Sequence, residues 1–294
     1  MDIVTDYISS LLPPVFAKYI SSLPQAKKNI LKEIRLRMGK PLALEYGNGC
    51  TFAQAQGVVT QDDITAVMAL LSDYSVNSVK DKLRRGFIPL KYGCRAGVAG
   101  EIIIKNGEIQ FQRNINSINI RIARECTGCS DSVFSSIYNG SQIFSTLIIS
   151  PPMTGKTTLL RDIARRLGDV ANVCIIDERG EIASCYNGIP QFDVGKRTDI
   201  LDLCPKPQGI PMAVRSMAPD VIITDEIGST DDCRALADAA QCGVSFIATM
   251  HSDSIDSAQK RESTHKLFND GIIKRAILLG NSKGVGTVEE IAVF

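Results

Sequence analysis

The segment at residues 146–167 limits the possible folds of this chain more than any other part of the sequence. It begins with the apolar run TLII, continues as SPPMTGKT at residues 150–157, and ends in an amphipathic stretch. The loop fits the pattern GxxxxGK[ST] at every specified position except the first, where Ser150 replaces glycine. A strand, such a loop and a helix in this order present backbone N–H groups and the positive end of the helix to a polyphosphate. The sequence therefore predicts a nucleotide site.

We expect ATP and Mg²⁺ as the cofactors of this site. Gly155 lets the backbone approach the phosphates closely, Lys156 is expected to reach the β- and γ-phosphates, and Thr157 is expected to offer its hydroxyl to Mg²⁺. Serine at position 150 is expected to weaken binding at most, because the second half of the loop makes most of the contacts. The expected nucleotide-binding residues are Ser150, Pro151, Pro152, Met153, Thr154, Gly155, Lys156, Thr157 and Thr158.

The rest of the C-terminal part alternates apolar runs of strand length with helical segments. The runs TLIIS, VCIID, DVIITDE and VSFIATMH are separated by stretches such as TTLLRDIARRL and CRALADAAQCG. This alternation is typical of a mainly parallel sheet that is covered by helices. We therefore predict an α/β fold, with a RecA-like P-loop NTPase domain at residues 126–294.

A smaller α+β domain is expected at residues 1–125. Apolar residues recur at helical spacing between Ile8 and Ile20, and Pro13 and Pro14 must break or start a helix there. Residues 33–37 alternate as a strand, residues 62–72 and 75–85 are expected to be helices, and residues 86–124 have a β pattern. Asn106 and Gly107 between two apolar runs predict a hairpin turn.

The predicted Walker B strand is the run VIIT, which leads into Asp225 and Glu226. Asp225 is expected to hold Mg²⁺, largely through its water shell. Glu226 is expected to orient and deprotonate the attacking water. The alternative for Glu226 is a carboxylate that caps the chain after a strand.

Further candidate catalytic residues follow two other strands. The run VCII leads into the segment DERGE, in which Glu178 and Glu181 are candidates, and Arg179 is expected to offset the dense negative charge together with Mg²⁺. The run FIATM ends at His251, a predicted sensor of the γ-phosphate. Because neighbouring parallel strands end at one edge of a sheet, these side chains are expected to lie together.

Bulk composition is that of a soluble globular protein, with 44% hydrophobic and 22% charged residues. Apolar runs are too short to span a membrane and the acidic N-terminus lacks a signal-peptide pattern, so a cytosolic protein is expected. Nine dispersed cysteines indicate reduced thiols, and the pair Cys126 and Cys129 lacks the partners of a zinc site.

Charge is unevenly distributed along the chain. Residues 1–125 contain 17 Lys and Arg against 11 Asp and Glu, whereas residues 126–294 contain 16 against 21. The net charges of the two parts are therefore +6 and −5. Either this reflects ordinary variation of surface charge, or the first part faces an anionic partner, a nucleic acid, a membrane or the acidic part of a neighbouring copy.

The order GKTT, DERGE, ITDE, ATMHS resembles the secretion-superfamily ATPases, which have a Walker A motif, an Asp box, a Walker B motif and a His box. More closely, the chain resembles the stage III sporulation protein AA family of endospore-forming bacteria. Ser150 and Gly180 depart from the usual pattern. The resemblance extends over nearly the whole chain and includes the segments EIRLR at 33–37, RGFI at 85–88, SINIRIARE at 117–125, VGKRTDILD at 194–202 and RSMAPDV at 215–221.

This resemblance implies a ring-forming ATPase, expected to be a homo-hexamer, that works in the cytoplasm of the mother cell. It would lie at the outer forespore membrane, at the base of a channel between mother cell and forespore, and power its assembly or transport. Its implied partners are the other proteins of the stage III sporulation complex, including a membrane-embedded docking protein.

Arginines distant from the phosphate loop are candidates to complete a site across a protomer boundary, although each could equally form a surface ion pair. Arg197 and Arg215 rank above Arg121 and Arg124 because they lie in the ATPase part. Two other functions stay open at this point. One is an ATPase that depends on single-stranded nucleic acid, which the lack of interleaved aromatic residues disfavours. The other is a nucleotide-switched scaffold with slow turnover.

Overall fold

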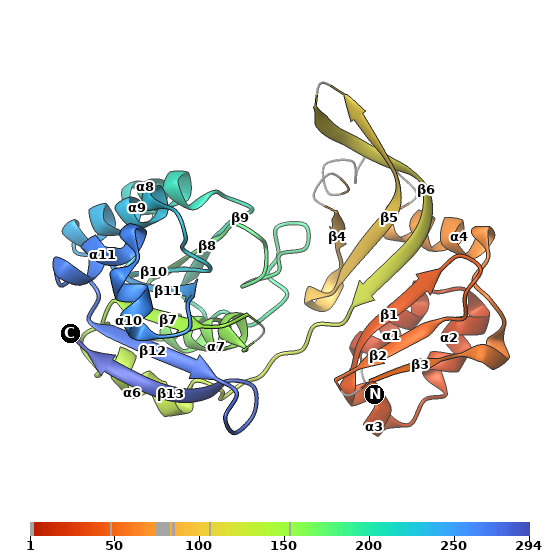
Figure 1. Cartoon of the computed structure of the whole chain (residues 1–294), viewed down its shortest axis with the longest axis horizontal. Coiled ribbons are helices and arrows are strands. Elements are labelled where there is room, and N and C mark those ends of the chain that lie inside the picture. Colours follow the sequence, from red (N-terminus) through yellow and green to blue (C-terminus); the bar gives the residue numbers. More distant parts are fainter. Residues whose placement is uncertain (1–2, 48, 74–82, 84–85, 106, 153) are drawn as a thin grey trace. The chain divides into compact units, whose positions relative to one another are not determined.

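The computed structural model describes residues 3–47, 49–73, 83, 86–105, 107–152 and 154–294 (Figure 1). The chain divides into two compact units, Met1–Arg124 and Glu125–Phe294. This division falls one residue before the boundary expected from the sequence. The helix expected at 75–85 and the turn residue Asn106 lie outside the described residues, apart from the helical Leu83.

The first unit contains a six-stranded antiparallel sheet with the strand order β3-β2-β1-β6-β5-β4. Its two longest strands, β5 and β6, form a hairpin in which Lys105 pairs with Glu108, as the sequence predicts. The strand predicted at 33–37 is confirmed as part of β1. The bounds are β1 Leu31–Arg37, β2 Ala43–Tyr46, β3 Gly49–Phe52, β4 Phe87–Pro89, β5 Arg95–Lys105 and β6 Glu108–Arg121.

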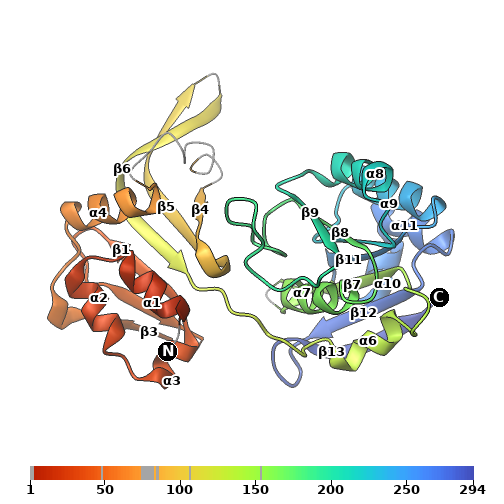
Figure 2. The ribbon, with the colours of Figure 1, turned by 180° about the vertical axis from the view of Figure 1, so that it is seen from behind.

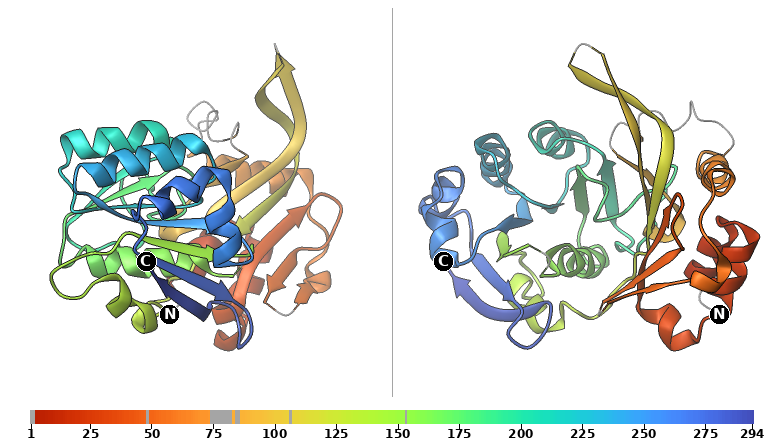
Figure 3. Two further views of the ribbon diagram at one scale, coloured as in Figure 1. Left: turned by 60° about the vertical axis from the view of Figure 1, so that its left-hand side comes forward. Right: turned by 45° about the vertical axis from the view of Figure 1, so that its right-hand side comes forward.

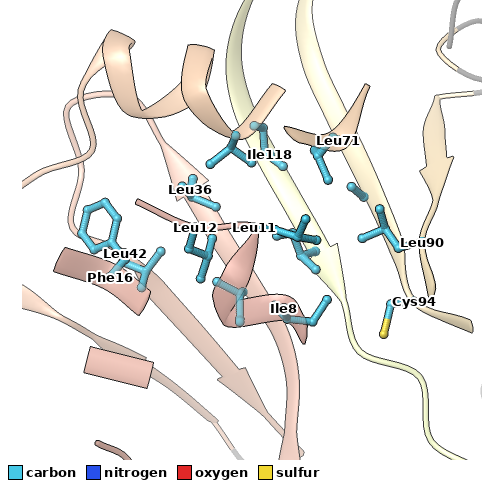
Figure 4. Close-up of a cluster of buried hydrophobic side chains, with 14 of the residues drawn as sticks. Ile8, Leu11, Leu12, Phe16, Leu36, Leu42, Leu71, Leu90, Cys94 and Ile118 are labelled. Atoms are coloured by element: carbon cyan, nitrogen blue, oxygen red, sulfur yellow. The ribbon is translucent and has the colours of Figure 1, made fainter. Parts of the chain in front are cut away.

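Helices cover one face of this sheet (Figure 2). Pro14 begins the second helix, as expected, since a proline at the first turn lacks only an N–H that no helical partner would accept. Phe16, Leu36, Leu42 and Ile118 meet in the core between helices and sheet (Figure 4). The bounds are α1 Ile3–Ser10, α2 Pro14–Ser21, α3 Gln25–Ile30, α4 Gln61–Leu71, η1 Gln54–Gln56 and η3 Lys91–Gly93.

The second unit contains a seven-stranded sheet with the order β13-β12-β7-β11-β10-β8-β9. Every neighbouring pair is parallel except β12 and β13. This arrangement confirms the predicted α/β class with a mainly parallel sheet. The bounds are β7 Thr146–Ser150, β8 Val173–Asp177, β9 Thr198–Asp202, β10 Val221–Thr224, β11 Ser245–His251, β12 Arg275–Gly280 and β13 Thr287–Val293.

Helices cover both faces of the second sheet (Figure 3). Ile148 of β7 packs with α6 and α7 on one face, whereas Leu147 and Ile149 pack with α8 to α11 on the other. Such all-apolar strands are typical of a parallel sheet that is buried on both faces. The bounds are α6 Asp131–Ile137, α7 Lys156–Leu167, α8 Lys206–Ser216, α9 Thr230–Gln241, α10 Ile255–Lys260 and α11 Glu262–Asn269.

The end of α7 packs tightly against the segment that leads into β9. A Cβ atom on Gly195 would lie 2.6 Å from the backbone of Gly168, and Gly195 has a φ of +87°. Both the close approach and the left-handed backbone therefore require glycine at position 195. Among the described residues, every helix is too short or too polar to cross a membrane.

Candidate functional site

The predicted phosphate loop connects β7 to α7. Ser150 is the last residue of β7, and α7 begins at Lys156, directly after Gly155. Gly155 has a φ of +87°, a left-handed conformation that other residues adopt at a cost, so the structure explains the glycine at this position. Met153 lies outside the described residues.

Serine at position 150 fits the loop without backbone strain. Its φ is not positive, so the position does not require glycine. Its hydroxyl contacts Thr154 Oγ1 and lies 2.7 Å from Pro151 O. Thr154 Oγ1 in turn donates to Pro151 O at 2.9 Å. The side chain that replaces glycine therefore belongs to a hydrogen-bonded network inside the loop.

Lys156 points into the centre of this loop. Its Nζ lies 2.8 Å from Ser150 Oγ, 2.9 Å from Pro151 O and 3.2 Å from Ser150 O, and it shares its three N–H groups among these oxygen atoms and His251 Nδ1. The side chain is almost fully buried, and burial lowers the pKa of Lys156, while the charge of Glu226 acts in the opposite direction. An ammonium group surrounded by oxygen atoms marks the place where an anionic phosphate oxygen would be recognised.

Three residues form a continuous chain of contacts: one begins α7, one follows β10 and one ends β11. Lys156 Nζ lies 3.0 Å from His251 Nδ1, and His251 Nε2 lies 2.9 Å from Glu226 Oε1. Glu226 also forms an ion pair with Arg179. The common carboxyl edge of β7, β10 and β11 brings these side chains together, as expected from the alternation of strands and helices in the sequence.

Glu226 has an unusual backbone conformation, with a φ of +35°. Its N–H donates to Thr249 Oγ1 at 2.8 Å, and Ile227 N–H donates to Thr249 O at 2.8 Å. A non-glycine residue in this region costs free energy and persists only where its surroundings fix it. Thr249 therefore holds Glu226 in place, a role that the sequence did not indicate.

The turn after β8 is built around Asp177. This fully buried carboxylate accepts backbone N–H groups of Glu181 at 2.7 Å and of Ile182 and Ala183 at 2.9 Å. Asp177 is therefore committed to shaping the turn. The turn directs Glu178 toward the start of α8, where it meets Lys206. The backbone carbonyl of Glu181 accepts Arg161 Nη2 at 2.8 Å.

Asp225 is the buried acid of the site. Its Oδ1 makes no hydrogen bond to any residue that the structure describes. Burial raises the pKa of this carboxyl group to about 6, against the opposing charge of Lys206, whose Nζ lies 3.8 Å from Oδ1. A buried carboxylate oxygen that makes no hydrogen bond to the described residues, at the edge of the sheet where α7 begins, fits the ligand chemistry of Mg²⁺.

Lys206 is a residue of this site that sequence reasoning missed. It is the first residue of α8, its side chain is buried, and its Nζ lies 2.5 Å from Glu178 Oε2. The sequence offered one signal, a lysine shortly after the run TDILD; that this run forms β9 beside β8 is known only from the structure. A lysine at that position is close to the same carboxyl edge.

The two candidate arginines lie elsewhere in the unit. Arg197 precedes β9 and donates to Asn172 Oδ1 at 3.0 Å and to Val170 O at 3.0 Å. Arg215 lies in the last turn of α8 and donates to Pro211 O at 3.0 Å. Both positions are at the opposite edge of the sheet from Lys156 of the same chain, because β9 and β10 begin there.

The turn between β12 and β13 approaches the phosphate loop. A Cβ atom on Gly155 would lie 3.6 Å from Val285 Cγ1 and 3.8 Å from Gly286 Cα. Val285 itself is 73% exposed. On the first turn of α7, Thr158 O accepts Cys129 Sγ at 3.6 Å. These contacts define the surroundings of the loop within the second unit.

Solved structures with a similar fold include a pilus retraction motor and an ATPase. The pilus retraction motor PilT, solved with bound ADP, has a TM-score of 0.61 at 16% identity, over 91% of this chain and 80% of that chain. The ATPase DotB of Legionella pneumophila has a TM-score of 0.60 at 16% identity, over 90% of this chain and 76% of that chain. The predicted secretion-ATPase fold is thereby confirmed.

Sequence relatives extend over nearly the whole chain. Stage III sporulation protein AA of Bacillus subtilis (strain 168) is 38% identical over 290 residues, which cover 97% of this chain and 94% of that protein. Protein SEEDLING PLASTID DEVELOPMENT 1 of Arabidopsis thaliana is 28% identical over 90% of this chain and 36% of its own length. The family model of sporulation stage III, protein AA matches residues 7–293. The chain therefore belongs to the sporulation stage III protein AA family.

Proposed function

We propose that this chain is a P-loop ATPase that binds ATP with Mg²⁺ and hydrolyses it to ADP and phosphate. The observation that carries the proposal is the contact chain from Lys156 through His251 to Glu226. It links the group that would hold the terminal phosphate to the group that would activate water. A lysine with a purely structural role would not need to contact a histidine that in turn contacts a glutamate.

Each residue of the chain has a defined role in this proposal. The N–H groups at the start of α7 and Lys156 bind the phosphates, and Gly155 lets the backbone come close. Thr157 and Asp225 hold Mg²⁺, Asp225 through water. Mg²⁺, when bound, would neutralise charge on the phosphate oxygens. Glu226 accepts the proton of the attacking water, and His251 senses the terminal phosphate from its place between Lys156 and Glu226.

Glu178 and Glu181 are proposed to shape the electrostatics of the site. Glu178 pairs with Lys206, and Glu181 contributes negative charge near Asp225. Arg179 pairs with Glu226 and can shift to the phosphates when they bind. The carboxylates of Glu178, Glu181, Asp225 and Glu226 are thus balanced by Lys206 and Arg179, cations that the chain itself supplies.

Calorimetry on the full chain tests this function. We expect saturable uptake of Mg-ATP and phosphate release above background, and loss of binding by at least about tenfold on Lys156→Ala. Lys260→Ala, at an exposed site in α10, is the matched control and should bind as wild type. No uptake by folded wild type at millimolar ligand would overturn the proposal.

Assembly into a homo-hexameric ring is proposed, with an arginine of one protomer reaching the nucleotide of the next. Arg215 is the better candidate because it is exposed and, among the described residues, hydrogen-bonds through its Nε to Pro211 O of its own helix. Arg197 commits three nitrogen atoms to Asn172 and Val170. Mixing inactive Lys156→Ala with inactive Arg215→Ala should restore turnover if the site is shared. Mixing that restores none would assign Arg215 another role.

The biological setting is proposed from the family. The chain would work in the cytoplasm of the mother cell at the outer forespore membrane, with the other stage III sporulation proteins and a membrane-embedded docking protein as partners. Expression in Bacillus subtilis that lacks its own stage III sporulation protein AA should restore sporulation. Expression of Glu226→Gln should not restore sporulation. Equal rescue by both chains would show that sporulation does not require ATP hydrolysis by this protein.

Two other functions have distinct signatures. A nucleic-acid-dependent ATPase would show strong stimulation by single-stranded DNA that weakens with salt. A nucleotide-switched scaffold would bind ATP with no measurable turnover as a pure oligomer. The contacts of Glu226 favour hydrolysis over the scaffold, which needs no acid so positioned. The nucleic-acid-dependent ATPase needs the same acid, so the stimulation assay separates it from the proposed function.

A further inference from the structure

Lys206 is a buried cation between the two acidic segments of the nucleotide site. Its side chain is 3% exposed, its Nζ lies 2.5 Å from Glu178 Oε2, and it lies 3.8 Å from Asp225 Oδ1. Glu178 follows β8 and Asp225 follows β10, which are neighbouring strands. One ammonium group therefore bridges the carboxyl ends of two strands.

The charges around Asp225 explain why a cation is needed there. Asp177 and Glu181 add negative charge near Asp225, and Arg179 adds positive charge. A buried carboxylate among like charges is costly unless a cation compensates it. Lys206 supplies this compensation from within the chain, at the positive N-terminal end of α8.

Lys206 occupies the kind of position that a divalent cation favours. Two carboxylates from adjacent strand ends converge on its Nζ, and such oxygen ligands are typical of Mg²⁺ and Mn²⁺ sites. The ammonium group donates to Glu178 but stays beyond hydrogen-bond distance of Asp225. Asp225 Oδ1 therefore keeps its lone pairs available for a ligand.

Packing fixes the lysine at this position. A Cβ atom on Gly209, in the next turn of α8, would lie 2.9 Å from Cys204 Sγ and 2.9 Å from Ile176 Cγ2. The start of α8 is thus pressed against β8, which positions Lys206 by its backbone. The ammonium group cannot leave the site by a movement of the helix without breaking this contact.

We infer that Lys206 is a positioning residue that takes the place of a second divalent cation and so limits the nucleotide site to one. Asp225 is left to hold the metal that accompanies the nucleotide, and Glu178 is kept away from it by the lysine. This inference rests on the proposed ATP binding, because the metal in question arrives with the nucleotide.

Counting bound Mn²⁺, a paramagnetic substitute for Mg²⁺, on the full chain with a non-hydrolysable ATP analogue tests this inference. Nucleotide occupancy is measured separately by displacement of a fluorescent analogue. We expect wild type to bind one Mn²⁺ per bound nucleotide. Lys206→Met should bind two Mn²⁺ ions. The second ion should bind at least about tenfold more tightly than any second ion binds to wild type, because a like charge has been removed. Lys206→Arg retains a fixed cation and should bind one.

Further variants separate the possible failures. Lys206→Gln keeps a hydrogen-bond donor for Glu178 without the charge, and it should also bind two Mn²⁺ if Lys206→Met does not fold. Lys260→Met is the control and should match wild type. Two Mn²⁺ on wild type, or one on each folded uncharged variant, would overturn the inference. Wild type that binds no nucleotide would overturn the proposed function instead.

Discussion

His251 Nε2 lies 2.9 Å from Glu226 Oε1, and this contact fixes the tautomer of the imidazole. An ammonium group can only donate, so His251 Nδ1 accepts from Lys156 Nζ at 3.0 Å. The ring proton therefore sits on Nε2 and is donated to the carboxylate. A phosphate that draws Lys156 away from Nδ1 would change the hydrogen bonding of Glu226 through a single ring.

Glu226→Gln should separate binding from turnover. Glutamine has the same shape and can keep a contact with His251, but it cannot accept a proton from water. We expect nucleotide affinity within about threefold of wild type and turnover lower by about 10²–10⁴-fold. Calorimetry and a phosphate-release assay measure the two quantities, and unchanged turnover would remove Glu226 from the role of base.

Two substitutions of His251 distinguish its nitrogen atoms. An Asn amide reaches roughly as far as Nδ1, whereas a Gln amide reaches roughly as far as Nε2. His251→Asn should keep the contact with Lys156 but lose the contact with Glu226. His251→Gln should keep the contact with Glu226 but lose the contact with Lys156. We expect turnover to fall more, by about tenfold or greater, in the Asn variant than in the Gln variant. Equal losses in both would argue against a relay.

Ser150→Ala should strengthen nucleotide binding. The hydroxyl accepts Lys156 Nζ at 2.8 Å and therefore stabilises the nucleotide-free position of the lysine. A hydrogen bond with a charged partner contributes about 1.5–3 kcal/mol, of which other oxygen atoms around Nζ replace part, so a gain of about fivefold is expected. Titration with Mg-ADP and Mg-ATP measures it, and Ser150→Gly tests the same hydroxyl with a more flexible backbone. Weaker binding by both variants would contradict this.

Asp225→Asn should stabilise the fold while it abolishes metal-dependent nucleotide binding. Burial raises the pKa of Asp225 to about 6, so between its ordinary value and about 6 the folded chain holds more protons than the unfolded chain. The free energy of unfolding of wild type therefore falls as pH rises through this window. At pH 7 the Asn variant should be more stable by about 2–3 kcal/mol, and below about pH 4 the two should converge. Urea unfolding at both pH values measures this, and a less stable variant at pH 7 would contradict it.

Asp162→Asn should have the opposite effect. Burial alone would raise the pKa of Asp162, but hydrogen bonds from the hydroxyl and N–H of Ser130 and from Arg165 lower it to about 2. This stabilisation is present above the ordinary pKa and is lost as pH falls toward 2. At pH 7 the variant should lose about 2 kcal/mol, with a smaller difference at pH 3. An equal loss at both values would indicate packing rather than charge.

Strand order explains why much of the site could be predicted. Apolar runs that end in Ser150, Asp177, Thr224 and His251 are parallel neighbours, so the residues that follow them share one edge. That geometry needs only the alternation of strands and helices, which the sequence displays. This alternation predicts that Lys156, Glu226 and His251 lie close together.

Lys206 escaped prediction for a physical reason. Its contacts depend on how α8 packs against β8, where Gly209 allows an approach that no sequence rule describes. The position of β9 at the edge of the sheet, beside β8, could not be predicted either, because a parallel strand can be added on either side of a sheet. Thr249 was missed since its hydroxyl acts on a backbone N–H, a contact that leaves no motif.

The contact between Gly168 and Gly195 has a consequence for motion within the nucleotide domain. Two backbones meet there without side chains between them, so α7 is anchored at its far end and cannot slide along its axis. Adjustment to an incoming triphosphate must then occur through torsions of the loop itself and of the first helical turn. A larger side chain at Gly168 or Gly195 would push the end of α7 away from the segment before β9. This shift would also move Lys156, which begins the same helix twelve residues before Gly168.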